Sequence, residues 1–348
     1  MNLISIQNKV DRVLIKIQNA QKFLIIASKP VDSDSIGTAL SIKWWLDKLN
    51  KESQIVVFAQ IPQDVKSFPD IDLIKQTYLD KVDFNSYDYI VLVDGNSWKQ
   101  FFTNNYVQIL NSIDKLKLIN IDHHMSGEIE KEIGDQVLRV EDCCTSKVFY
   151  DLFLKNRIDI DVRVAEYMFL ALVGDTGNFK HAMYSDTFLF AQTLVNTGIN
   201  IQKVLYRPVS KSTSDFTFWM YQNCEFYPEI ECMLLKIDTK KREELDKLFG
   251  DGWDFNNFDY FFKLYFAANI EGFFYFVKFS EEQDKSEKVF TRISWRRSNY
   301  GAKVNLMDIF SICNFECGGH LNAGGGISKY SVEETSRMFL EEMYKFYK

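Results

Sequence analysis

Residues Leu116 to His124 read LKLINIDHH, an apolar run that favours a β-strand and ends in a carboxylate followed by two adjacent imidazoles. The chain has only four histidines, and this stretch uses two of them. In open α/β sheets, ligands bind beyond the carboxyl ends of the strands. A strand that delivers Asp122, His123 and His124 there presents oxygen and nitrogen ligands to such a crevice. The stretch therefore predicts a metal site at the end of a strand.

Other apolar runs repeat this pattern along the first half of the chain. Helical spacing over residues 4–22, 36–49 and 161–173 alternates with short apolar runs at 23–27, 54–59, 89–93 and 116–121. Near-continuous apolar strands separated by helices are typical of a parallel sheet buried on both faces. Three of the strands stop at acidic loops, which carry Asp32 with Asp34, Asp94, and Asp122. The first half is therefore predicted to be a parallel α/β domain.

The second half differs in character. Residues 186–221 are mainly helical and interrupted by polar residues, and strands follow at 232–237, 273–279 and 289–295, the last two around a charged turn at 280–288. This pattern predicts a smaller mixed α+β domain after a helical connection. The expected limits are 1–190 for the first domain, 191–222 for the linker and 223–348 for the second domain.

Composition excludes several classes of protein. With 348 residues and 46% hydrophobic content, the chain has material for about two domains. It lacks an apolar run of about 18 to 20 residues and a signal-peptide core, so no membrane partner and a cytoplasmic location are expected. Six cysteines without a CxxC pair indicate buried thiols. A net charge of −7 argues against coating long nucleic acid, although bound divalent cations would still attract a small phosphorylated substrate.

The acidic positions are individually weak signals. Asp32 and Asp34 are also suited to capping the following helix, and Asp94 is also a common turn residue at a strand end. Taken together with the helix-end motif Gly174-Asp175-Thr176-Gly177, they carry more weight. A dinuclear site needs several oxygen and nitrogen ligands and one bridging carboxylate. Five residues of the right type end predicted strands or helices: Asp32, Asp34, Asp94, His123 and Asp175.

The ordered motifs resemble those of the DHH phosphoesterases, a family that includes RecJ-type exonucleases, cyclic-dinucleotide phosphodiesterases and short-oligoribonucleotide hydrolases. Four motifs match in order along the first domain, and they are Asp32-Ser-Asp34-Ser-Ile-Gly37, Val93-Asp94, Asp122-His123-His124 and Gly174-Asp175-Thr176-Gly177. The resemblance extends to the second domain, where Arg296 and the run Gly318-Gly319-His320 are similar to the motifs of the DHH-associated substrate domain.

The resemblance implies two metal ions. One would be held by Asp32 and Asp94, and the other by Asp34, Asp94, His123 and Asp175, with Asp94 as the bridge. His124 would lie beside the ions or against substrate, and Asp122 would orient an imidazole. One position departs from the family pattern, because Ser28 stands where the family has a histidine that ligates the first ion. A hydroxyl is a poorer ligand than imidazole, so the first ion is expected to bind more weakly.

The second domain is expected to bind substrate. Gly318 and Gly319 would allow close approach of the backbone, and Arg296 and His320 would hydrogen-bond a phosphate or a base. A plain glycine turn is the alternative interpretation of that loop. Glu316 and Cys317 stand where the family has further glycines, so the shape of the pocket stays open.

The resemblance implies a cytoplasmic hydrolase closest to the bifunctional oligoribonuclease and 3′-phosphoadenosine 5′-phosphate (pAp) phosphatase branch. Two Mn²⁺ ions, with Mg²⁺ as the alternative, would activate water for attack on short RNA or DNA oligonucleotides or small nucleotides. A cyclic or linear dinucleotide phosphodiesterase acting on c-di-AMP or pApA is the second hypothesis. A nucleotide-binding homologue impaired by Ser28 is the third. The resemblance also allows a homodimer.

Overall fold

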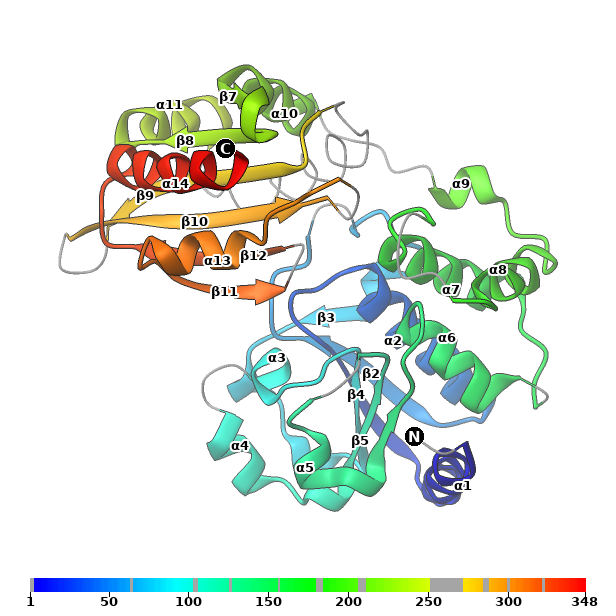
Figure 1. The fold of residues 1–348 in the computed structure, drawn as a ribbon. Helices are drawn as coiled ribbons and strands as arrows, with labels where there is room; N and C mark the ends of the chain where they lie inside the picture. Colours follow the sequence, from blue (N-terminus) through cyan, green and yellow to red (C-terminus); the bar gives the residue numbers. More distant parts are fainter. Residues whose placement is uncertain are drawn as a thin grey trace. The chain divides into compact units, whose positions relative to one another are not determined.

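The hydrophobic runs of the first half form a parallel sheet in the computed structural model, which confirms the predicted α/β class (Figure 1). The structure describes residues 3–62, 65–102, 106–124, 127–155, 157–179, 184–205, 211–250, 272–283, 288–298, 301–320 and 323–348. At residues 3–5, 135, 213, 319, 320 and 323 it describes the backbone alone. Two compact units, Met1–Pro208 and Val209–Lys348, are described separately below. The expected limits 1–190, 191–222 and 223–348 stay a prediction.

Six strands make the sheet of the first unit, and every pair in it is parallel. Their spatial order is β3-β2-β1-β4-β5-β6. The chain thus turns to one side of β1 first and to the other side afterwards, which creates a topological switch point between β1 and β4. The strands are β1 Lys22–Ala27, β2 Glu52–Val57, β3 Ile74–Gln76, β4 Tyr89–Val93, β5 Leu118–Asp122 and β6 Val137–Arg139.

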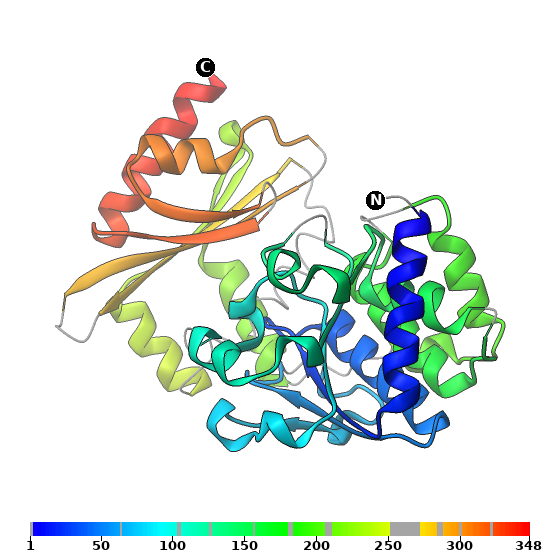
Figure 2. The same cartoon turned by 90° about the horizontal axis from the view of Figure 1, so that it is seen from below.

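Helices cover both faces of this sheet, which explains why β1, β4 and β5 are apolar and buried along most of their length. One face packs with α1 Leu3–Asn19, α2 Ser33–Lys48, α6 Thr145–Phe149 and α7 Val162–Asp175. The other face packs with α3 Trp98–Phe102, α4 Tyr106–Ser112 and α5 Glu130–Ile133. Figure 2 shows α1 in dark blue beside the green helices of the same unit. Helices α8 Thr187–Val195 and α9 Ile201–Leu205 contact α7.

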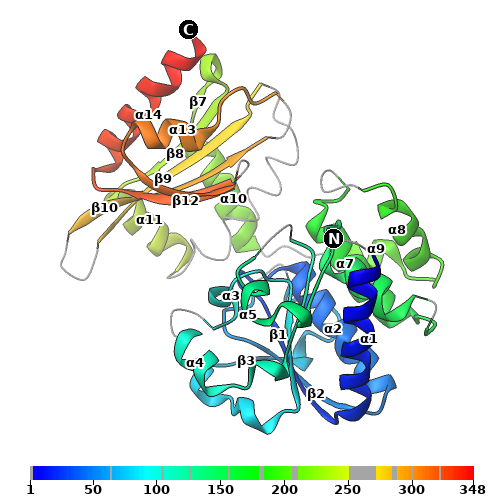
Figure 3. The same ribbon diagram turned by 60° about the horizontal axis from the view of Figure 1, so that its bottom comes forward.

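The second unit is a mixed sheet in the order β11-β12-β10-β9-β8-β7. Only the pair β8 and β9 is parallel among the strands described. Helices α13 Leu306–Ile312 and α14 Val332–Tyr347 cover one face, and α10 Lys211–Asn223 and α11 Thr239–Phe249 lie on the other (Figure 3). The strands are β7 Cys224–Tyr227, β8 Cys232–Ile237, β9 Tyr275–Gln283, β10 Val289–Arg297, β11 Glu316–His320 and β12 Ala323–Ser328.

Two boundaries differ from the sequence prediction. The strand expected from residue 116 begins at Leu118, because Lys115–Lys117 form a 3-10 turn in which the Asp114 carboxylate accepts from the Leu116 N–H. The turn expected from residue 280 begins later, because β9 continues to Gln283 opposite β10. The remaining single turns are 3-10 at Ile71–Leu73, Leu79–Lys81, Phe84–Ser86, Gly134–Gln136 and Pro228–Ile230, and π-helical at Tyr150–Leu154.

The cysteines agree with the expectation of buried thiols. All six cysteines are free thiols, and five of them are buried. Among the residues that the structure describes, no helix has both the length and the apolar character needed to cross a membrane.

The contact between α2 and α7 holds the first acidic loop against the end of α7, and it depends on Gly37. A Cβ atom at Gly37 would lie 2.5 Å from the carbonyl oxygen of Tyr167 and 3.0 Å from the Cβ of Ala171. We expect Gly37→Ala to destabilise the protein by about 1–3 kcal/mol, the usual cost of overpacking a core. Urea unfolding followed by circular dichroism measures this change. Gly134→Ala is the matched control, because no atom lies within 4 Å of a Cβ there, and equal stabilities of the two variants would contradict the argument.

Candidate metal centre

The loop between β1 and α2 positions the first two carboxylates. Asp32 is the N-cap of α2, where its side chain accepts from the Ser35 N–H at 2.9 Å, so it does serve as a helix cap. Asp34 lies in the first turn of the helix and is only 1% exposed. Its two oxygens accept hydrogen bonds from the backbone N–H of Thr145 at 2.7 Å and of Ser146 at 3.1 Å. Asp34 is therefore a buried anion held by donors from a distant segment.

Asp94 directly follows β4 and sits at the switch point of the sheet. Its φ is +62°, a left-handed conformation that is uncommon outside glycine. The carboxyl is buried and accepts from the Thr145 hydroxyl at 2.8 Å. Burial raises the pKa of the Asp94 carboxyl well above its usual range, and the carboxylates of Asp34 and Asp32 raise it further.

The triplet at the end of β5 is oriented residue by residue. His123 Nδ1 lies 2.9 Å from the backbone carbonyl of Asp142, and this leaves Nε2 facing Asp94 and Asp175. His124 Nδ1 lies 2.6 Å from Asp122, whose other oxygen accepts from Arg139 at 2.9 Å. Asp122 is completely buried. Burial disfavours its charge, but the hydrogen bonds from His124 and Arg139 outweigh burial and lower the pKa of Asp122.

Asp175 is the last residue of α7 and closes the site from the other side. Its carboxylate oxygen lies 3.4 Å from His123 Nε2. Burial and the Asp34 carboxylate raise the pKa of Asp175 to about 8, although His123 acts in the opposite direction. Burial lowers the pKa of His123, but Asp34 and Asp175 reverse the effect and the net shift is upward. The site therefore gathers several acids that repel one another when ionised.

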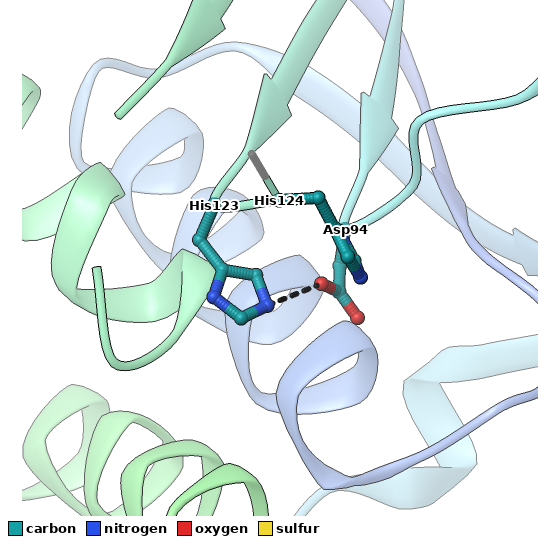
Figure 4. A group of neighbouring side chains, drawn as sticks. All are labelled: Asp94, His123 and His124. Atoms are coloured by element: carbon teal, nitrogen blue, oxygen red, sulfur yellow. Dashed lines mark ion pairs between the residues drawn. The ribbon is translucent and has the colours of Figure 1, made fainter. Parts of the chain in front are cut away.

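The structure brings the predicted ligands together in two overlapping groups. The ligand atoms of Asp34, His123 and Asp175 lie within 4.8 Å of one another, and so do those of Asp94, His123 and His124 (Figure 4). Asp32 is in neither group among the described residues, but its charge is close enough to raise the pKa values of Asp94 and Asp175. Ser28 is buried at the end of β1, where its N–H donates to the Val93 carbonyl.

This donor set fits a divalent cation. Hard carboxylate oxygens and imidazole nitrogens suit ions such as Mn²⁺. The repulsion from neighbouring carboxylates that raises the pKa values of Asp94 and Asp175 would be relieved when a cation binds between them. The assignment of Asp32, Asp34, Asp94, His123 and Asp175 as ligands stays a prediction that the geometry supports.

Sequence reasoning missed the segment that organises these ligands. Thr145, Ser146 and the Asp142 carbonyl contact Asp34, Asp94 and His123, as described above. Lys147 anchors the segment, because its buried ammonium forms ion pairs at 2.7–2.8 Å with Asp142, Asp151 and Asp186. Short runs of small residues such as Cys143 to Ser146 have no helical or strand periodicity in the sequence. Their role becomes visible only in the folded structure, where they contact residues that are distant in the chain.

The predicted substrate residues lie in the second unit. Arg296 is in β10, opposite Ala323 of β12, and Gly318 is in β11, opposite Gly325. A Cβ atom at Gly318 would meet no atom within 4 Å, so the space beside it is open. The plain glycine turn is wrong for Gly318, Gly319 and His320, which belong to β11 and pair with β12. His181, which the sequence suggests has a structural role, lies outside the described residues.

Metal binding at this centre should depend steeply on pH. Mn²⁺ binds the ionised carboxylate, and a pKa of about 8 at Asp175 means that a proton occupies it at lower pH. We therefore expect the Mn²⁺ affinity to fall about tenfold per pH unit for each displaced proton as the pH drops below 8. Isothermal titration calorimetry at pH 6, 7 and 8 in buffers of different ionisation enthalpy measures both the affinity and the protons released. A constant affinity over this range would contradict the proposed crowding of acids.

The hydroxyl of Thr145 should contribute to metal affinity although it is not a predicted ligand. Thr145→Val keeps the shape of the side chain but removes the hydrogen bond to Asp94. Loss of a partner of a metal ligand typically weakens metal binding by about 10–100-fold, and we expect a decrease in Mn²⁺ affinity at the lower end of that range. Thr193→Val is the control, since its hydroxyl on α8 bonds the Leu189 carbonyl and Tyr150, neither of which is a predicted ligand. Equal Mn²⁺ affinities of the two variants would show that Thr145 has no such role.

Comparison with known proteins identifies the type of domain that carries this centre. Residues 22–172 match the model of the DHH family, N-terminal domain. The match includes the carboxylates of the β1–α2 loop, Asp94 and the Asp122-His123-His124 triplet, and it ends three residues before Asp175. Residues 22–172 of the first unit are therefore similar to a DHH-family N-terminal domain.

Relatives and solved structures extend this result. The "Probable manganese-dependent inorganic pyrophosphatase" of Enterococcus faecalis is 26% identical over 164 residues, which cover 46% of this chain and 49% of that protein. The chain thus spans about half the length of the curated relatives of this name that it matches. An exopolyphosphatase-related protein from Bacteroides fragilis has a TM-score of 0.77 at 21% identity, covering 98% of this chain and 97% of that one. RecJ from Thermus thermophilus, solved with Mn²⁺, has a TM-score of 0.51 at 8% identity, over 100% of this chain and 55% of that one. At these identities the structures show a shared fold.

Proposed function

We propose that this chain is a Mn²⁺-dependent phosphoesterase that hydrolyses short oligonucleotides, pAp or both. The observation that carries the proposal is the meeting of Asp34, Asp94, His123 and Asp175, which come from the start of α2, the carboxyl ends of β4 and β5 and the end of α7. This edge of an open parallel sheet is where such folds bind ligands. The match to a DHH-family domain and the manganese-dependent pyrophosphatases named above supports a metal-dependent hydrolase.

The predicted ligands form two sets, one for each of two metal ions. Asp34, His123 and Asp175 would hold one ion, Asp32 would contribute to the other, and Asp94 would bridge them. When bound, the ions would lower the pKa of a water molecule that they hold to near neutral. They would also neutralise charge on the phosphoryl oxygens of the substrate. The N–H groups of Thr145 and Ser146 keep the Asp34 carboxylate in place, and the Asp142 carbonyl keeps the His123 Nε2 lone pair directed at the site.

The second unit would supply substrate recognition. Arg296 presents a guanidinium that suits a phosphate group, and the open space beside Gly318 allows a nucleotide to approach the backbone of β11. His320, next to Gly319 in the same strand, is placed by its register opposite Ala323. A nucleotide substrate would use these groups, whereas inorganic pyrophosphate has no base to bind.

One assay separates the candidate substrates. Purified protein with Mn²⁺ should release mononucleotides from 5′-phosphorylated tri- to pentaribonucleotides, or phosphate from pAp. Faster hydrolysis of c-di-AMP or pApA would favour the dinucleotide phosphodiesterase. Turnover of pyrophosphate alone would favour the activity named for the Enterococcus relative. Binding of a nucleotide without turnover of any substrate would refute the enzyme proposal and support an impaired, nucleotide-binding homologue.

Asp94 should be essential for turnover, because its carboxylate would contact both ions. We expect Asp94→Asn to lower kcat by at least about 10²–10³-fold, the effect typical of removing one group that stabilises transition-state charge. Asp47→Asn is the control, since Asp47 is a half-exposed carboxylate on α2 that pairs only with Lys43 among the contacts described. Rates are compared under saturating Mn²⁺, with circular dichroism to check folding. Near-normal activity of Asp94→Asn would exclude the dinuclear model.

A further inference from the structure

We propose that His124 is a direct metal ligand, and that its Nε2 binds the ion held by Asp94. The inference rests on the proposed metal centre and adds a ligand that the sequence motifs placed only beside the ions or against substrate. It concerns the ion that would otherwise have carboxylates and water alone.

The geometry places a ligand atom of His124 close enough to Asp94 for the two residues to share one ion. The ligand atoms of Asp94, His123 and His124 lie within 4.8 Å of one another, and the two imidazole rings are 4.6 Å apart between centroids (Figure 4). Ligand atoms on opposite sides of an ion are separated by about 4.2 Å, twice a typical metal–nitrogen distance. The spacing of these ligand atoms is therefore compatible with a shared ion.

The hydrogen bonds of His124 select the ring nitrogen that is free to bind metal. Its Nδ1 lies 2.6 Å from Asp122, and the second oxygen of that carboxylate accepts from Arg139. An ionised carboxylate only accepts hydrogen bonds, so the neutral ring carries its proton on Nδ1 and its lone pair on Nε2. A carboxylate–histidine pair of this kind is the usual support of a metal-bound imidazole. The side chain of His124 is 39% exposed, so its free edge is accessible.

In both His123 and His124 the Nδ1 atom faces an acceptor oxygen and Nε2 is left for a metal ion, but the two imidazoles would bind different ions. His123 Nδ1 faces the Asp142 carbonyl, which is also only an acceptor, and its Nε2 lies between Asp175 at 3.4 Å and Asp94 at 3.6 Å. One nitrogen lone pair binds one ion. If His123 serves the ion at Asp34 and Asp175, an imidazole for the ion at Asp94 has to come from another residue. Ser28 offers only a hydroxyl, whereas His124 is already oriented for this role.

The first experiment measures Mn²⁺ binding rather than turnover. Isothermal titration calorimetry on the full chain should show two ions for the wild type. His124→Gln should weaken one of them at least about tenfold and leave the other within about twofold. Asp47→Asn is the control. It changes a polar side chain on the surface of the same unit, where Asp47 pairs with Lys43, and it should leave the binding of both ions unchanged. The melting temperature of the metal-free proteins checks that the variants fold. Unchanged Mn²⁺ binding in folded His124→Gln would overturn the proposal.

A second variant tests the orienting bond and avoids replacing the histidine. In Asp122→Asn the amide oxygen is expected to face Arg139, so the amide N–H₂ faces His124 and the ring proton moves to Nε2. This tautomer cannot bind metal, and we expect the same weakening as in His124→Gln. The double variant should bind Mn²⁺ no more weakly than either single variant. Additive losses would show that the two residues act separately and would contradict the proposal.

Pulsed electron paramagnetic resonance identifies the ligand atom. Bound Mn²⁺ in His123→Gln should retain the ¹⁴N modulation of a coordinated imidazole, and the His123→Gln/His124→Gln double variant should lose it. Bound Mn²⁺ without ¹⁴N modulation in His123→Gln would refute His124 as a ligand. A wild-type protein that binds no Mn²⁺ would instead refute the metal centre on which the inference rests, so the two failures are distinguishable.

Discussion

The central constraint in this protein is the burial of several carboxylates in one place. Burial raises the pKa values of Asp94 and Asp175, and the neighbouring Asp34 carboxylate raises both further, because the site excludes the water that would separate these charges. Backbone N–H groups and the Thr145 hydroxyl partly offset this repulsion. A divalent cation would offset it more completely, since it would be the largest charge in the site. The fold thus maintains an arrangement that is unfavourable without a positively charged ligand.

Three separate parts of the fold maintain this arrangement. The parallel register of β1, β4 and β5 ends these strands side by side, so the residues that follow them meet at one edge. The close contact at Gly37 fixes α2 against α7 and therefore Asp34 against Asp175. The segment from Asp142 to Ser146 then ties the edge together by contacting three of the predicted ligands. Lys147 stabilises that segment through three carboxylates, and a buried ammonium needs such partners to remain charged.

Several strands and several of the predicted metal ligands could be predicted from the sequence. Features that depend on contacts between distant residues could not. Strands β1, β4 and β8 follow from uninterrupted apolar runs, and Asp94 and His123 follow from acids and imidazoles at strand ends. Strands β11 and β12 were not predicted, because glycine has low β propensity. The glycine at 324 is explained only by the folded structure, in which Trp295 leaves no room for a side chain there. Thr145 and Ser146 were not predicted either, because their role depends on contacts with residues about 50 to 110 positions away.

The adjacent histidines show how the end of a strand permits chemistry that its interior does not. Within a strand, neighbouring side chains point to opposite faces of the sheet. Asp122 is the last residue of β5, so His123 and His124 lie just beyond this alternation and both rings can approach Asp94. Their different acceptors, a backbone carbonyl for His123 and a carboxylate for His124, orient the rings independently. Two neighbouring residues can thereby serve two ions, which accounts for an imidazole at Asp94 in a chain that has a serine at position 28.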